Sequence, residues 1–173
     1  MRRNTICVLA ITSIWLLVGH TIWAQQKGND KEHAELAKAL KGVKTSLEKG
    51  LSASESQGKP ISGKFEVEDG KLQLSVYTMK GDKFSEVIVD HTTGKVAKTE
   101  AITGGGDLTA AKAQSETMAK AKSSLRAATE KAVKANKGFR AVSAMPSLKD
   151  GHPVAEITLV KGEEFKTVSE KLD

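Results

Sequence analysis

The apolar residues of this chain switch from helical spacing to strand-like alternation, and the switch occurs twice in the same order. Leu36, Leu40 and Val43 recur at the interval that places side chains on one face of a helix. Beyond them, apolar and polar residues alternate through three stretches, at 61–67, 72–76 and 84–89. A chain with this pattern buries one face of each helix and each strand, which predicts an α+β fold of helices packed on an antiparallel sheet.

Local signals divide the first occurrence of the pattern into two helices and three strands. Thr45, with Glu48 three residues on, forms a capping-box pattern and predicts the start of a second helix. The turn sequences Asp69-Gly70 and Lys80-Gly81-Asp82 separate the alternating stretches, as expected for hairpins. The first unit is therefore predicted to contain two helices followed by antiparallel strands.

The second occurrence begins after three consecutive glycines, Gly104 to Gly106, where Asp107 stands as a predicted helix cap. Helical spacing then resumes at Leu108, Ala111, Met118, Leu125 and Val133. Features of the first unit return in order: Ser124-Leu125 after Ser46-Leu47, Asp150-Gly151 after Asp69-Gly70, and Lys161-Gly162 with Phe165 after Lys80-Gly81 with Phe84. The sequence thus predicts two tandem repeats of helices packed on an antiparallel β-sheet, with a first unit at 31–102, a glycine-rich linker at 103–106 and a second unit at 107–173.

The N-terminal residues predict export. Arg2 and Arg3 precede an apolar run at 6–18, and Ala24 stands before a polar stretch that begins at Gln25. This order of charged, apolar and small residues is typical of a secretory signal peptide, and the run is shorter than the roughly 20 residues that a membrane-spanning helix needs. We therefore expect residues 1–24 to be cleaved. The mature chain is then expected in the periplasm, the cell envelope or the medium, without membrane insertion; an uncleaved anchor is the alternative.

Cleavage would leave a chain without thiols or tryptophan. The one cysteine, Cys7, and both tryptophans, Trp15 and Trp23, lie in the predicted leader. The mature chain would form no disulfides, so packing must stabilise it. Its lysines are spread along the sequence, and one tyrosine and four phenylalanines are few aromatic residues for a surface that stacks bases. We therefore expect no nucleic-acid partner.

The end of the first unit resembles a known family. The predicted strand at 84–89 runs into Asp90, two spacer residues and the sequence Thr93-Gly94-Lys95-Val96. This ending, with the helix and strands before it, resembles a PepSY domain over residues 31–98. The second unit keeps the layout but has Glu170 and Lys171 at the positions of Val89 and Asp90, and it reaches Asp173 without a Thr-Gly pair. It resembles a degenerate copy.

The PepSY-like ending also has a purely structural interpretation. Asp90 can accept hydrogen bonds from the backbone amides that follow it, and Gly94 supplies a positive φ where the chain folds back. We therefore assign Asp90 and Gly94 to a structural turn and not to a ligand site.

The resemblance implies a protein that binds other proteins. PepSY domains resemble the pro-regions of thermolysin-type metallopeptidases, and tandem helix-and-sheet repeats are similar to secreted β-lactamase inhibitor proteins. One face of such a sheet is expected to stay free of helices as a docking surface. Tyr77 is the candidate partner contact, because aromatic side chains are enriched among the residues that dominate binding energy. We expect a non-catalytic module that inhibits or regulates an envelope or secreted peptidase.

The residue pattern favours no enzyme, cofactor or metal. His33, His91 and His152 lack neighbours at metal-ligand spacing, so a zinc site would need all three to meet in the fold. The glycines before Asp107 lack the Lys and the Ser or Thr of a phosphate-binding loop. We therefore expect a protein that is not an enzyme.

A different class of function stays open beside protein binding. Glu66, Glu68 and Asp69 are candidate ligands for a cation, although acids in strands and turns more often form solvated surface. The alternative function is therefore that of a structural envelope protein, or of one that binds a small ligand or a cation.

Overall fold

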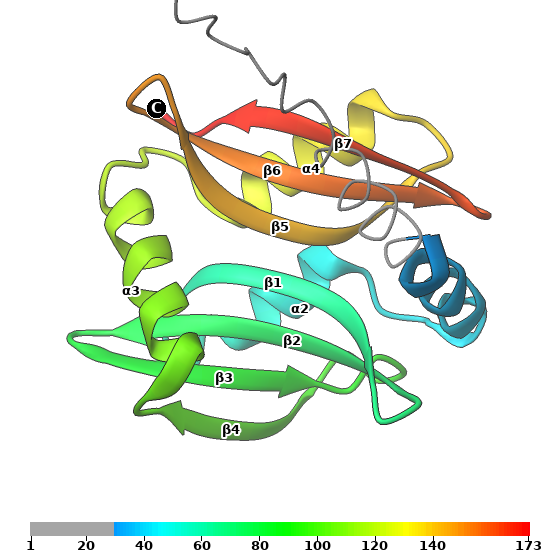
Figure 1. The fold of residues 1–173 in the computed structure, drawn as a ribbon, viewed down its shortest axis with the longest axis horizontal. Helices are drawn as coiled ribbons and strands as arrows, with labels where there is room; N and C mark the ends of the chain where they lie inside the picture. Colours follow the sequence, from blue (N-terminus) through cyan, green and yellow to red (C-terminus); the bar gives the residue numbers. More distant parts are fainter. Residues whose placement is uncertain (1–29) are drawn as a thin grey trace, which may run out of the picture.

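The computed structural model describes residues 30–173, and its architecture is mixed α+β (Figure 1). The described part begins with a helix over 30–39, here named the N-terminal helix, which continues into the 3₁₀ turn η1 (Leu40–Gly42). The elements that follow are α2 (Leu47–Ser54), β1 (Lys59–Glu68), β2 (Lys71–Lys80), β3 (Lys83–Val89), β4 (Val96–Ile102), α3 (Gly105–Ala119), α4 (Leu125–Ala135), β5 (Arg140–Lys149), β6 (His152–Lys161) and β7 (Glu164–Lys171). The predicted signal peptide at 1–24 lies outside the described residues.

The strands form one antiparallel sheet in the order β4-β3-β2-β1-β5-β6-β7. Hairpins run outward from the centre, where β1 meets β5 with Gly63 opposite Ala144 and Lys64 opposite Ser143. The α+β class and the antiparallel strands predicted from the sequence are confirmed. The strands of both predicted units share a single sheet, and β4 was not predicted, because five of its seven side chains are exposed and its sequence has no apolar alternation.

Different helices cover the two faces of the sheet (Figure 1). Gly63 faces α2, since a Cβ added there would lie 3.0 Å from Leu51 Cδ2. The preceding residue, Ser62, points the other way, and its Oγ donates a 2.8 Å hydrogen bond to Oε1 of Gln114 in α3. Consecutive strand residues point to opposite faces, so α2 and α3 lie on opposite sides of the sheet. In Figure 1, α4 lies behind the sheet with α2, and α3 crosses in front.

The hydrophobic core fills the space between the sheet and the pair α2 and α4. Its fully buried side chains include Leu47, Leu51, Ile61, Leu74, Val76, Val87, Leu125, Ile157 and Leu159. Gly50 lets α2 approach β2 closely, because a Cβ there would lie 2.5 Å from Leu74 Cδ2. Burial of these aliphatic groups is the main source of stability in a chain that has no disulfide in its described part.

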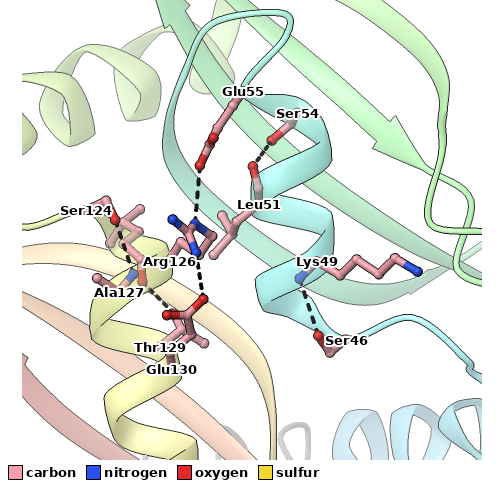
Figure 2. A network of polar contacts seen from close by, with 11 residues as sticks. Ser46, Lys49, Leu51, Ser54, Glu55, Ser124, Arg126, Ala127, Thr129 and Glu130 are labelled. Carbon is pink, nitrogen blue, oxygen red and sulfur yellow. Dashed lines mark hydrogen bonds and ion pairs between the residues drawn. The ribbon is translucent and has the colours of Figure 1, made fainter.

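Matching caps begin α2 and α4 (Figure 2). Ser46 Oγ accepts a hydrogen bond from the amide of Lys49 at 3.3 Å, and Ser124 Oγ accepts one from the amide of Ala127 at 3.1 Å. The capping box predicted at Thr45 is therefore wrong by one residue. Ser46 has the extended backbone that a cap requires, whereas Thr45 is buried, and its Oγ1 has no hydrogen-bond partner within residues 30–173.

An ion-pair network joins α2 to α4 (Figure 2). Arg126 at the start of α4 places Nε 3.4 Å from Oε1 of Glu55, the residue that follows α2, and donates from Nη1 to Oε1 of Glu130 at 2.7 Å. These groups are about half exposed, so each pair contributes little to stability. The pair with Glu55 links the two helices, and the pair with Glu130 lies within α4.

Helix α3 corrects two expectations from the sequence. It begins at Gly105 after the cap residue Gly104, and Asp107 lies in the first turn and not at the cap. It also crosses the face of the sheet that was expected to stay free of helices. The helix buries Ala111 and Met118, and polar contacts also attach it; Lys59 Nζ, for example, donates to the carbonyl of Met118 at 3.1 Å.

The N-terminal helix packs at the end of the sheet away from α3 (Figure 1). Leu36 and Leu40 are buried, and the ring of His33 stacks on Phe165 with 4.1 Å between centroids. Within residues 30–173, no helix has the length and apolar character needed to cross a membrane.

Candidate functional site

The polar side of the sheet, opposite α2 and α4, is the candidate functional site. Strand alternation that buries Leu74 and Val76 against α2 turns their neighbours toward α3. We name this surface the α3-side face and define it by Ser62, Lys64, Ser75, Tyr77 and Glu86. The register supports the grouping, because Ser62 and Glu86 each lie opposite Tyr77, and Lys64 lies opposite Ser75.

Tyr77 is attached to α3 by its hydroxyl. The phenol Oη donates a 2.9 Å hydrogen bond to Oδ1 of Asp107 in the first turn of α3, and the side chain is half-buried. Burial, the hydrogen bond to Asp107 and the nearby carboxylates Glu86 and Glu66 all raise the pKa of the Tyr77 phenol well above its ordinary value. The tyrosine therefore stays neutral and acts as a hydrogen-bond donor.

A small polar cavity lies beside Tyr77, between α3 and the sheet. Its volume is about 150 Å³, and its lining is Ser62, Lys64, Ser75, Tyr77, Asp107, Ala110, Gln114 and Met145. Many of its polar atoms are already paired. Ser62 donates to Gln114, Ser75 donates to Glu86, and Lys64 forms an ion pair with Glu66. The arrangement offers hydroxyl, amide and carboxylate groups for hydrogen bonding at the edge of α3.

The candidate turn residues lie on the other side of the first unit. Oδ1 of Asp90 accepts hydrogen bonds from the amides of Thr92 and Thr93, at 2.9 and 2.6 Å, and from the Thr93 hydroxyl at 3.0 Å. The amide of Gly94 donates to the carbonyl of Asp90 at 2.8 Å, and Gly94 has a φ of 73°. The hydrogen bonds from Thr93 and Thr92 lower the pKa of the Asp90 carboxyl.

This turn contacts the segment that leads into α2. The carbonyl of His91 accepts hydrogen bonds from the amides of Lys44 and Thr45, at 3.2 and 3.0 Å. Gly94 packs against the same segment, where a Cβ would lie 2.9 Å from Lys49 Cε and 3.2 Å from Thr45 Oγ1. Asp90 and Gly94 thus contribute to packing beside α2, whereas Tyr77 faces α3.

The histidines and acids considered for metal binding do not gather. His33 belongs to the N-terminal helix, His91 to the turn after β3, and His152 to the start of β6, where its Nδ1 lies 2.8 Å from Oδ2 of Asp173. Glu66 is paired with Lys64. Across the described residues, no group of three His, Cys, Asp or Glu side chains has the arrangement needed to hold a metal ion.

The α3 half of this site was not predicted from the sequence. Asp107 was interpreted as a helix cap, and Gln114 carried no motif. A usable signal was present in β2, where polar Ser75 and amphipathic Tyr77 alternate with Leu74 and Val76 and so mark a second, partly covered face.

No relative of this chain was found among known proteins. No family model, no curated protein and no solved structure matches the chain.

Proposed function

We propose that this chain is an exported, non-catalytic binding module that holds a protein partner, a peptidase, on its α3-side face. The observation that carries the proposal is the position of Tyr77, the one tyrosine of the chain, half-buried on a polar sheet face beside a small cavity. A rigid aromatic side chain with a polar tip, surrounded by hydrogen-bonding groups, is typical of the residues that dominate protein interfaces.

The proposal includes a tandem duplication of one PepSY-like unit. Equivalent features support it: Ser46 and Ser124 as helix caps, Asp69 and Asp150 as positive-φ turn residues, and the carbonyls of His91 and Leu172 as acceptors for two successive amides before a helix. The strand order, with β1 and β5 adjacent at the centre, is also consistent with two units placed side by side. The second unit has Glu170 and Lys171 where the first has Val89 and Asp90, in keeping with a degenerate copy.

The choice of a peptidase as partner rests on the PepSY resemblance of residues 31–98. In that family, the likeness to metallopeptidase pro-regions implies a domain that binds and restrains an enzyme. Export, proposed from residues 1–24, would place the module in the envelope or the medium, where such peptidases act.

Site-directed photo-crosslinking tests the proposed surface. A benzophenone-bearing residue placed at position 77 should form an adduct with a peptidase when the protein is incubated with the envelope fraction of the cells that produce it. The matched control places the same residue at position 99, an exposed threonine of β4 that pairs with Val87 and so belongs to the opposite face.

The expected result is an adduct from position 77 that is absent from position 99, and mass spectrometry would identify the captured protein. Equal adducts from both positions would mean nonspecific contact, and an adduct from position 99 alone would place the interface elsewhere. No adduct from either position would favour the small-ligand or structural alternative.

A further inference from the structure

A second cleft lies away from the α3-side face, between the N-terminal helix and the adjoining ends of β5 and β6. Its volume is about 720 Å³, within the range of pockets that hold small organic ligands. Its apolar lining consists of Ala34, Ala37, Leu40, Phe139 and Val160, and its charged lining of Lys38, Lys41, Arg140, Lys161 and Glu163. Figure 1 shows the N-terminal helix beside this end of the sheet.

Positive charge is concentrated in this cleft. Four cationic side chains line it against one acid, Glu163. A further cation, Lys166, places its Nζ 3.9 Å from the ring centroid of Phe139, and Lys161 Nζ lies 5.9 Å from the same ring. Two ammonium groups held at one aromatic ring repel each other, so an anion bound here would relieve that repulsion.

The cations of this cleft are not neutralised by ion pairs in the described part of the chain. Elsewhere Lys64 pairs with Glu66, Lys98 with Glu100 and Lys131 with Glu170. None of the ion pairs formed within residues 30–173 includes Lys38, Lys41, Arg140, Lys161 or Lys166.

Arg140 is the most constrained of these cations. It is half-buried, its Nη2 donates a 3.0 Å hydrogen bond to the carbonyl of Thr45, and its guanidinium lies over the ring of Phe65. Burial lowers the pKa of Arg140, and the charge of Glu48 opposes that shift only in part. A guanidinium fixed in this way keeps other N–H groups for a carboxylate or a phosphate, the anions that its fork geometry matches.

The floor of the cleft is apolar. Leu40 and Val160 are buried, and Phe139, which also lines the cleft, is half-buried. A ligand that matches both the cationic and the apolar lining needs an anionic head group near the lysines and an apolar portion against the apolar side chains. We propose that this cleft binds an amphiphilic organic anion, a phosphate or carboxylate head attached to an apolar chain.

Calorimetric titration of the purified protein tests the proposal with three probes, each below its critical micelle concentration where it has one. Octyl phosphate carries both parts, inorganic phosphate carries the head alone, and octyl glucoside carries the chain on a neutral head. We expect octyl phosphate to bind at least about tenfold more tightly than either of the others. Its affinity should weaken as salt is added. Equal affinity for inorganic phosphate would overturn the apolar part of the proposal, and equal affinity for octyl glucoside would overturn the anionic part.

A charge-matched pair of variants locates the site. Lys38→Gln with Lys161→Gln should weaken octyl phosphate binding about tenfold or more, whereas Lys98→Gln with Lys131→Gln, which removes the same charge elsewhere, should leave it unchanged. Equal losses in both double variants would mean a general charge effect and would contradict the site. Thermal melting confirms that each variant is folded, and the salt dependence of the unmodified protein tests the proposal without any variant.

Sedimentation with lipid vesicles distinguishes a free amphiphile from a membrane surface as the source of the head group. The protein should not sediment with phosphatidylcholine vesicles, with or without phosphatidylglycerol, because a lipid anchored in a bilayer cannot place its chain in the cleft. Sedimentation with the anionic vesicles that is lost in the Lys38→Gln, Lys161→Gln variant would overturn the proposal in favour of surface binding. None of these measurements depends on the peptidase, so each proposal can fail without the other.

Discussion

The hydroxyl of Tyr77 in β2 donates a 2.9 Å hydrogen bond to Oδ1 of Asp107 in α3. This contact ties the sheet of the first predicted unit to the helix that opens the second. It also sets the state of the candidate binding surface, because the phenol is held neutral and in a fixed direction at the edge of α3.

Tyr77 can be titrated directly, since it is the one tyrosine of the chain. The ultraviolet absorbance of the phenolate should rise at a pH well above the usual midpoint of about 10, because burial and the bond to Asp107 raise the phenol pKa. In Asp107→Ala the midpoint should move back toward the ordinary value. A midpoint near 10 in the unmodified, folded protein would show that the contact is absent in solution.

The raised pKa of the Tyr77 phenol also makes the free energy of unfolding depend on pH in the alkaline range. A phenol whose folded-state pKa is raised contributes stability that is fully present below its unfolded pKa and is lost as pH rises through the folded pKa. Urea unfolding should therefore show falling stability above about pH 10, and Tyr77→Phe should reduce this fall.

The contribution of Asp90 to stability should instead be lost at acidic pH. Its folded-state pKa is lowered by the amides of Thr93 and Thr92, so its contribution is present above the unfolded pKa and is lost as pH falls through the folded one. We expect Asp90→Ala to lower the melting temperature at neutral pH and to flatten its decline in acid. The melting temperature of Asp90→Asn, which keeps an acceptor oxygen, should lie between those of the unmodified protein and of Asp90→Ala. Unchanged melting in Asp90→Ala would contradict the assignment of Asp90 to the turn.

Val76 tests the core. Its side chain is fully buried against α2, so Val76→Ala should lower the free energy of unfolding by about 1 to 3 kcal/mol. The control Val168→Ala, at a half-buried position of the edge strand β7, should cost clearly less. Equal effects in urea unfolding would mean that Val76 is not buried more deeply than Val168.

The sequence predicted those parts of the fold that local residue patterns determine. Alternation located β1, β2 and β3, and Asp69-Gly70 and Lys80-Gly81 located their hairpin turns, because positive φ restricts which residues stand there. The helix start was misplaced from Ser46 to Thr45. Both residues suit a cap chemically, and the choice depends on backbone geometry and on the burial of Thr45, which come from tertiary packing.

The arrangement of elements that are far apart in the sequence could not be predicted from local residue patterns. The junction of β1 with β5 pairs Gly63 with Ala144 and Lys64 with Ser143, and these residues carry no pairing signal in the sequence. The position of α3 depends on the burial of Ala111 and Met118 and on polar contacts, such as Ser62 with Gln114, that join residues far apart in the chain. Tyr77 was selected as a contact from its residue type, and the groups around it became known only from the fold.

Export gives a further prediction, from residues that precede the described part. N-terminal sequencing of the protein from the envelope or the medium should begin at Gln25, because the residues before it form a signal-peptide pattern. The processed protein should show tyrosine but no tryptophan fluorescence, since Trp15 and Trp23 would be removed. Intact protein beginning at Met1 in the cytosol would contradict the prediction.

The most direct test of the proposed function is a titration of peptidase activity. Purified protein should reduce the activity of a thermolysin-type metallopeptidase from the envelope of the producing cells until inhibition saturates. Tyr77→Ala should weaken inhibition by about 2 kcal/mol, or roughly 30-fold in the inhibition constant, while Thr99→Ala leaves it unchanged. Undiminished peptidase activity at saturating protein, or substrate turnover by the protein alone, would contradict the account.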